Sequence, residues 1–159
     1  MANKFSYSGD PKEAFSYKGK GYSPIQLQKG ILGVESTLGT DRKPRYEPLY
    51  HESMKANPKW IPTRSEKRVI KDRGYEAATK EFSTSRGSYQ ILPETAYRYT
   101  SFVGEPEDLE DVGVEGQVWL ELMKKWQEDS GGDLEGFVTR WNGGGNNQDY
   151  LRKLVPWMQ

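Results

Sequence analysis

The residue of this sequence best suited to acid–base chemistry is Glu35, which follows an apolar helical stripe. Leu27, Ile31 and Val34 recur at the spacing of one buried helical face, and Glu35 comes directly after them. Gly39 is a natural end for that helix, so Glu35 stands in its last turn. Partial burial and the negative end of the helix dipole both favour a protonated carboxyl group, which a general acid requires. The alternative is an ordinary exposed glutamate at a helix end.

Two further polar stretches have residue types that can hold a ligand. In residues 83–96, Gly87 allows close approach of the backbone, and Gln90 can donate and accept hydrogen bonds without carrying charge. In residues 140–147, a predicted helix runs into an asparagine followed by three glycines, the loosest backbone of the chain. These stretches and Glu35 are well separated in the sequence, so a fold must bring them together.

The composition excludes several other chemistries. The chain has no cysteine, so disulfides, thiolate metal ligands and thiol nucleophiles are all absent. His51 is the single histidine, and with one adjacent glutamate it is weak evidence for a metal site. A surface pair is the simpler interpretation. We therefore expect no metal ion and no cofactor.

Charge is unevenly distributed, although the formal net charge is zero. Residues 1–87 hold 17 Lys and Arg against 10 Asp and Glu, and residues 88–159 hold 6 against 13, which together give the totals of 23 and 23. A basic half suits an anionic polymer such as nucleic acid or a cell-wall glycan, and an unevenly charged solvated surface explains it equally well. Zero net charge and the lack of a recognised binding motif argue against nucleic acid.

Helical patterns dominate the chain. Ser23 is a suitable N-cap, and Pro24 a suitable first residue, for the helix that carries Glu35. Prolines in residues 41–62 keep that segment extended or turned, so it forms at most a short hairpin. The fold class is therefore mainly α. Further helices are predicted over residues 65–73, 75–82, 93–97, 114–128, 134–141 and 148–155.

The chain divides into a polar arm, residues 1–22, and one domain, residues 23–159. The arm repeats an aromatic motif, since Phe5-Ser-Tyr-Ser-Gly9 is echoed by Phe15-Ser-Tyr-Lys-Gly19, and it shows no sustained period. We interpret it as a docking segment for a partner, with packing on its own domain as the alternative. No apolar run is long enough to cross a membrane, and the N-terminus lacks the apolar core of a signal peptide.

Together, three of these stretches resemble the motifs of lysozyme-like lytic transglycosylases, in the order in which that family has them. They are Val34-Glu35-Ser36, then Gly87-Ser-Tyr-Gln-Ile-Leu-Pro-Glu-Thr-Ala96, then Arg140-Trp-Asn-Gly-Gly144. The resemblance implies a lysozyme-like domain, mainly α with a small or vestigial β-hairpin. It implies that Glu35 is the catalytic acid, and that substrate is contacted by Ser36, Gly87, Tyr89, Gln90, Trp141 and Asn142. Of these, Trp141 and Asn142 match the pair that also contacts the acid.

The chain departs from this family in ways that bear on the reaction. Ser88 and Tyr89 replace Leu and Met, Trp141 replaces the usual Tyr, and about fifty residues separate the first two motifs. That insert carries Arg45-Tyr-Glu-Pro-Leu-Tyr-His51, which resembles the Phe-Glu-x-His stretch of bacteriophage N-acetylmuramidases. Asp41 and Glu47 are therefore candidates for a second carboxylate that would recruit water.

The resemblance implies cleavage of the β-1,4 bond between N-acetylmuramic acid and N-acetylglucosamine in peptidoglycan. As a lytic transglycosylase, the protein would leave 1,6-anhydro-muramic ends. The alternatives are an inverting muramidase with a second carboxylate, and an inactive structural virion protein of the same fold. The expected partners are glycan strands and, through residues 1–22, other virion proteins. A small cysteine-free lysozyme-like chain without a signal peptide also resembles a phage protein, delivered to the host cell wall either by the virion, which is its expected location, or at lysis.

Overall fold

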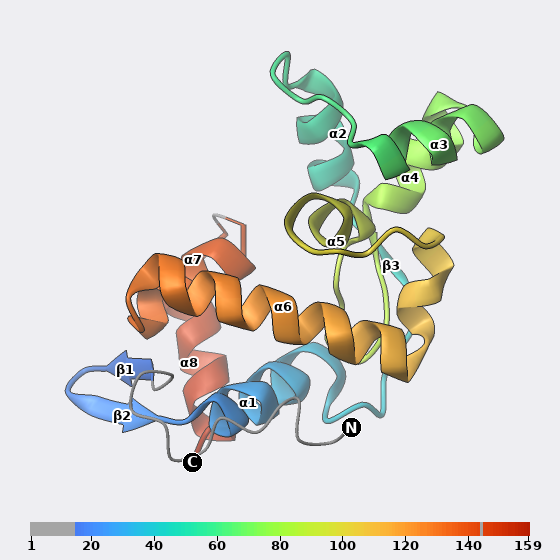
Figure 1. Cartoon of the computed structure of the whole chain (residues 1–159). Coiled ribbons are helices and arrows are strands. Elements are labelled where there is room, and N and C mark those ends of the chain that lie inside the picture. Colours follow the sequence, from blue (N-terminus) through green and yellow to red (C-terminus); the bar gives the residue numbers. More distant parts are fainter. Residues whose placement is uncertain (1–14, 144) are drawn as a thin grey trace. The chain divides into compact units, whose positions relative to one another are not determined.

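The computed structural model describes residues 15–143 and 145–159, and this part of the chain is mainly helical (Figure 1). The mainly α fold class is thereby confirmed, while the lysozyme-like character stays a prediction. Two small antiparallel sheets accompany the helices. The elements are β1 (Phe15–Tyr17), β2 (Lys20–Tyr22), α1 (Pro24–Ser36), β3 (Arg45–Tyr46), α2 (Pro48–Ala56), α3 (Arg64–Arg73), α4 (Tyr75–Phe82), β4 (Thr84–Ser85), α5 (Pro93–Tyr99), the 3-10 helix η3 (Pro106–Glu110), α6 (Val112–Ser130), α7 (Leu134–Trp141) and α8 (Asn147–Trp157).

These residues form two compact units. Unit 1 combines the described residues up to Gly39 with Trp119–Gln159, and unit 2 is Thr40–Val118. Helix α6 contributes its first residues to unit 2 and the remainder to unit 1. The first and third sequence motifs thus belong to unit 1 and the second to unit 2. The single domain predicted over residues 23–159 stays a prediction.

In unit 1, α1 packs on α8 (Figure 1). Leu27 and Ile31 of α1 are fully buried, as their helical spacing predicts. A Cβ atom at Gly33 would lie 2.2 Å from the ring of Trp157 in α8. Because no real side chain approaches that closely, the glycine is what allows α8 to lie against α1 at this level.

The predicted start of α1 is confirmed, and its end comes earlier than Gly39. The Ser23 side chain accepts a hydrogen bond from the Gln26 N–H, and the Gln26 side chain accepts one from the Ser23 N–H. The helix ends at Ser36, because Thr37 adopts the left-handed conformation with a φ of 51°. Glu35 is therefore the last residue but one of α1.

Helix α6 carries much of the core of unit 1. Trp119, Leu122, Met123 and Trp126 are at most 6% exposed, so both tryptophans belong to the core. Trp119 and Trp126 each meet the ring of Phe137 edge-on at 6.2 Å. Within the described ranges, no helix combines the length and the apolar character needed to cross a bilayer.

The hairpin β1–β2 packs as part of unit 1. Phe15 is fully buried and meets Phe137 edge-on at 5.5 Å, and the Ser16 N–H donates a hydrogen bond of 2.8 Å to Gly132 O. Residues 15–22 of the segment expected to be a docking arm are therefore held by their own unit, the alternative considered for them. Residues 1–14 lie outside the described residues, and the docking role stays a prediction.

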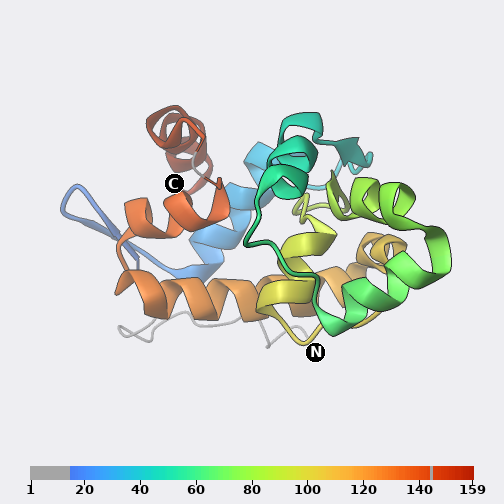
Figure 2. The same cartoon turned by 90° about the horizontal axis from the view of Figure 1, so that it is seen from above.

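Unit 2 contains α2 to α5, η3, the start of α6 and the strands β3 and β4 (Figure 2). Helices α3 and α4 confirm those predicted at residues 65–73 and 75–82. The start of α3 is fixed by a capping box, in which Thr63 and Glu66 exchange two hydrogen bonds. Val69, Ala78 and Phe82 are fully buried, so both helices contribute to the core of this unit.

Residues 41–62 differ from the prediction of an extended segment with at most a short hairpin. Strand β3 pairs with β4, which lies outside the segment. Much of the remainder forms α2, with Pro48 in its first turn. A proline is accommodated there because the first N–H groups of a helix have no helical acceptor to lose. Pro48 therefore marks the start of a helix rather than an extended segment.

Candidate functional site

Glu35 is held by side chains from two other helices of unit 1. The hydroxyl group of Tyr150 in α8 donates a hydrogen bond of 2.6 Å to Glu35 Oε2. The Nε1–H of Trp141 in α7 is shared between the same oxygen, at 3.3 Å, and the Tyr150 oxygen, at 2.9 Å. Residues from three helices, α1, α7 and α8, thus form one hydrogen-bonded group around a half-buried carboxyl group.

The packing of α8 explains why Tyr150 reaches Glu35. Tyr150, Leu154 and Trp157 recur at helical spacing and share one face of α8. Leu154 is fully buried, and Trp157 packs against Gly33 of α1. The face that packs on α1 is therefore the face that presents the Tyr150 hydroxyl. The sequence predicts this helix but does not mark Tyr150, although the spacing between Tyr150 and Leu154 places both on one helical face.

Trp141 is fixed by the aromatic core of unit 1. Its ring stacks on Phe137 at a centroid distance of 6.3 Å and meets Trp119 edge-on at 5.4 Å. These contacts orient the indole N–H toward Glu35. Burial raises the pKa of the Tyr150 hydroxyl well above its usual value, and the Glu35 carboxylate raises it further. Tyr150 therefore remains a proton-bearing donor at neutral pH.

The contacts of the Glu35 carboxyl group indicate which chemistry it can perform. No family model, curated protein or solved structure matches the chain. One oxygen of Glu35 is oriented by two donors, and the residue is exposed enough to be reached by a substrate. A carboxyl group that is both oriented and reachable is suited to proton transfer.

Ser36 and Asn142 make contacts at helix ends. Ser36 Oγ donates to Leu32 O at 3.1 Å and accepts from the Gly39 N–H at 2.8 Å. Asn142 is the C-cap of α7, and its Nδ2 donates to Asn147 Oδ1 at 3.1 Å. These hydrogen bonds complete the ends of α1 and α7. The substrate contacts implied for both residues stay predictions.

In unit 2, the second motif forms a turn that is braced by Gln90. The amide Nε2 of Gln90 donates to Gly87 O at 2.8 Å and to Lys43 O at 3.2 Å, and its Oε1 accepts from the Ser85 hydroxyl at 2.9 Å. Gln90 is 8% exposed. The side chain expected to hold a ligand thus holds the turn itself, and its contact with substrate stays a prediction.

The turn closes on Glu115, a residue of α6 that the sequence did not single out. Its Oε1 and Oε2 accept hydrogen bonds from the N–H groups of Ser88 and Tyr89, at 3.0 Å and 2.7 Å. A Cβ atom at Gly87 would lie 2.2 Å from Oε2. The close approach that Gly87 permits is therefore an approach to a carboxyl group of the chain itself. Sequence spacing gave no signal for this pairing.

The candidate second carboxylates, Asp41 and Glu47, flank β3 in unit 2 and are exposed. Asp41 pairs with Arg45 Nη2 at 3.2 Å, and its other oxygen accepts from the Lys43 N–H at 3.4 Å. Glu47 is the N-cap residue of α2, and its side chain makes no capping hydrogen bond. Both carboxylates are accessible to a ligand in solution, and their role as a water-activating base stays a prediction.

A buried pair of carboxyl groups in unit 2, Glu66 and Glu94, was also missed. Glu66 is fully buried and Glu94 is 4% exposed. Arg98 serves both, with its Nε 2.5 Å from Glu94 Oε1 and its Nη2 3.2 Å from Glu66 Oε1. Burial, followed by the hydrogen bond with Glu94, raises the pKa of Glu66 to about 8. Burial and the neighbouring Glu94 outweigh the opposing effect of Arg98 on this pKa, so Glu66 keeps its proton at neutral pH.

His51 is buried, which corrects the expectation of a surface pair. It is 3% exposed, and its Nδ1 and Nε2 lie 2.7 Å from the Tyr46 hydroxyl and 2.9 Å from Thr79 Oγ1. Since Thr79 Oγ1 donates to a main-chain oxygen, it accepts from Nε2–H, and Tyr46 donates to Nδ1. In the part of the chain that the structure describes, no three His, Cys, Asp or Glu residues are grouped to hold a metal ion.

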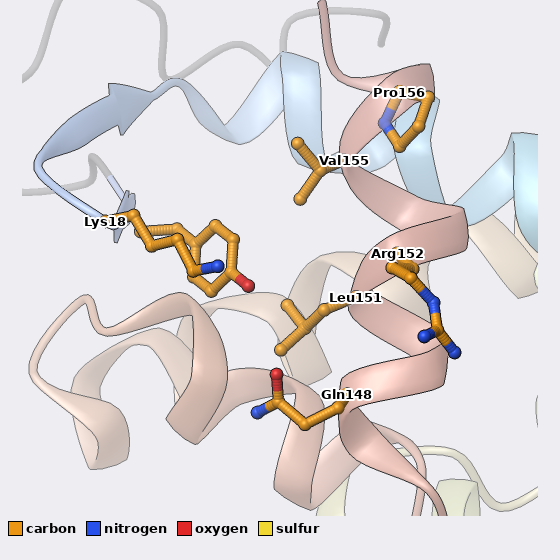
Figure 3. A pocket seen from close by; sticks show the side chains of 7 residues that line it. Lys18, Gln148, Leu151, Arg152, Val155 and Pro156 are labelled. Carbon is orange, nitrogen blue, oxygen red and sulfur yellow. The ribbon is translucent and has the colours of Figure 1, made fainter.

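A cavity of about 460 Å³ lies in unit 1 between the β1–β2 turn and α8 (Figure 3). Gln148, Leu151, Arg152 and Val155 line it at the spacing of one helical face, together with Tyr17 and Lys18. Tyr150 stands on the opposite face of α8. The cavity is therefore separate from the hydrogen-bonded group around Glu35.

Proposed function

We propose that this protein cleaves the β-1,4 bond between N-acetylmuramic acid and N-acetylglucosamine of bacterial peptidoglycan, as a lytic transglycosylase. The observation that carries the proposal is the Glu35 carboxyl group, half-buried at the end of α1 and held by Tyr150 and Trp141. The order of the three sequence motifs supports the substrate class. The proposal uses the Glu35 group of unit 1 as its catalytic centre.

Glu35 acts first as an acid and then as a base. In the first step it gives its proton to the glycosidic oxygen while the bond from that oxygen to muramic acid C1 breaks, and the sugar becomes oxocarbenium-like. In the second step the Glu35 carboxylate takes the proton of the muramic acid's own 6-hydroxyl, whose oxygen bonds to C1. The products are a free N-acetylglucosamine hydroxyl and a 1,6-anhydro end, and Glu35 is protonated again.

The contacts of Glu35 support this double use. Tyr150 and Trp141 both donate to Oε2, so the transferable proton belongs on Oε1. The donors also stabilise the carboxylate that forms between the two steps. Because α7 and the aromatic core fix Trp141, the carboxyl group keeps its orientation through both proton transfers.

The experiment compares the native protein with Glu35→Gln on purified peptidoglycan. The amide keeps the shape of the side chain and loses the transferable proton, so release of soluble muropeptides should fall by about 10²- to 10⁴-fold. The unfolding midpoint in urea should stay within error of the native value. Glu128→Gln, at an exposed carboxylate of α6, is the matched control and should release muropeptides at the native rate. Substantial release by folded Glu35→Gln would remove Glu35 from the reaction.

A further inference from the structure

Glu115 forms the buried base of the second motif. It lies in the first turn of α6 and is 1% exposed. Both of its oxygens are occupied by main-chain N–H groups, those of Ser88 and Tyr89. The Gly87 backbone passes so close to the carboxyl group that no Cβ atom fits there. The turn is therefore shaped around this one side chain.

The Gly87–Gln90 turn is itself hydrogen-bonded to the segment of residues 41–47. Arg42 Nε donates to Ser88 Oγ at 2.8 Å, and Gln90 Nε2 donates to Lys43 O at 3.2 Å. Strand β3 of the same segment pairs with β4, which immediately precedes the turn. A continuous set of hydrogen bonds thus leads from Glu115, through the turn, to the segment that carries Asp41 and Glu47.

The charge on Glu115 controls the strength of the hydrogen bonds that it accepts from the N–H groups of Ser88 and Tyr89. An ionised carboxylate accepts both N–H bonds strongly, whereas a protonated one is a weaker acceptor and adds a donor that must itself be satisfied. Burial raises the pKa of Glu115 to about 7, against the opposing effects of the two N–H groups and of Arg42. In the described part of the chain, the charged group that faces Glu115 is Arg42, whose Nη2 lies 3.9 Å from Glu115 Oε1.

We propose that Glu115 is a positioning residue whose ionisation orders the Gly87–Gln90 turn and, through it, residues 41–47, so that substrate affinity depends on pH in the neutral range. The ionised form holds Ser88 and Tyr89, and with them Arg42 and Lys43. The protonated form loosens them. The ordering itself stands on the contacts of unit 2, and only its effect on substrate rests on the proposed function.

The first test follows the main-chain amides of the ¹⁵N-labelled full chain by NMR between pH 5 and 9. The N–H signals of Ser88 and Tyr89 should shift together with a midpoint near 7. The signals of Arg45 and Tyr46 should follow with the same midpoint, although neither amide touches Glu115. All four transitions should be lost in Glu115→Gln and kept in Glu128→Gln.

A second variant keeps the test decisive if Glu115→Gln does not fold. Arg42→Gln removes the cation that favours the ionised form, so the shared midpoint should move to higher pH. A transition at Ser88 and Tyr89 without one at Arg45 and Tyr46 would overturn the ordering of residues 41–47. The role of Glu115 would be overturned if the transitions persisted in folded Glu115→Gln. It would also be overturned if the native protein showed no such transitions.

The functional readout uses soluble, uncross-linked glycan strands as the probe. Glu115→Gln should raise KM about tenfold at pH 8, the loss expected for one unsatisfied buried hydrogen bond, with kcat nearly unchanged. The KM of the native protein should rise as the pH falls below 7, and that of Glu115→Gln should not. A fall in kcat alone would contradict the effect of Glu115 on substrate affinity. If the native protein cleaves no strands, the proposed function fails, and the amide transitions still decide the role of Glu115.

Discussion

Glu35 and Glu115 are two glutamates held by hydrogen-bond donors in opposite ways. Glu35 receives its donors from the side chains of Tyr150 and Trp141 and is partly exposed. Glu115 receives its donors from the main chain of one turn and is 1% exposed. A carboxyl group that exchanges protons with a substrate must be reachable, and one that fixes a turn must be enclosed. The same residue type thus fits chemistry in unit 1 and architecture in unit 2.

The two surroundings also differ in what they tolerate. Around Glu115 the backbone itself is in contact, so any added atom must displace main chain or the carboxyl group. Around Glu35 the donors are side chains, and the hydroxyl group of Tyr150 can be removed while its ring stays in the packed face of α8. Substitutions that add atoms next to Glu115 should therefore act mainly on stability, and removal of a donor hydroxyl group beside Glu35 mainly on activity.

The largest effect is expected for Gly87→Ala. The new Cβ atom would meet the Glu115 carboxyl group and would impose a side chain on a backbone with a φ of 80°. We expect the free energy of unfolding to fall by about 2 to 6 kcal/mol, the sum of overpacking and backbone strain. Urea unfolding measures this loss.

Gly74→Ala is the matched control for this comparison. Gly74 has a φ of 89°, and a Cβ atom there would meet nothing within 4 Å. Gly74→Ala therefore introduces the backbone strain alone, about 1 to 3 kcal/mol. Equal losses for the two alanines would show that the contact with Glu115 contributes nothing, and the contrast between the two carboxyl groups would fail.

A smaller effect is expected for Tyr150→Phe. This change removes the stronger donor to Glu35 and leaves the ring in the packed face of α8. Turnover of peptidoglycan should fall about tenfold to a hundredfold, as expected for a hydrogen bond to a charged group, and unfolding should change by about 1 kcal/mol. Tyr75→Phe, at an exposed tyrosine, is the control. A large loss of stability with unchanged turnover would make Tyr150 a packing residue.

Local signals in the sequence predicted most of the helices. The cap at Ser23, the proline at Pro24 and the spacing of Leu27 and Ile31 each specify one feature of α1, and the structure contains all of them. Helix α2 was missed because Pro48 is compatible with both an extended segment and the first turn of a helix. Local sequence signals cannot distinguish an extended segment from a helix start when tertiary contacts determine which of the two forms.

The partners of the two carboxyl groups depend on tertiary packing. Glu35 was identifiable because it follows an apolar stripe on its own helix. Tyr150 and Trp141 reach it only through the packing of α8 and the aromatic core, which no spacing within the chain encodes. Glu115 was hidden for a different reason. Its partners are main-chain N–H groups, which every residue except proline carries, so no residue type marks the contact.

The central claim is that Glu35 alone performs both proton transfers of a wall-cleaving reaction. Mass spectrometry of digested peptidoglycan tests it most directly, because transglycosylation and hydrolysis yield products that differ by one water. We predict muropeptides that end in 1,6-anhydro-muramic acid and are lighter by that water. Ordinary reducing ends would contradict the claim and assign a second carboxylate, with Asp41 and Glu47 as the candidates. Intact glycan strands after incubation with folded protein would contradict the cleavage itself.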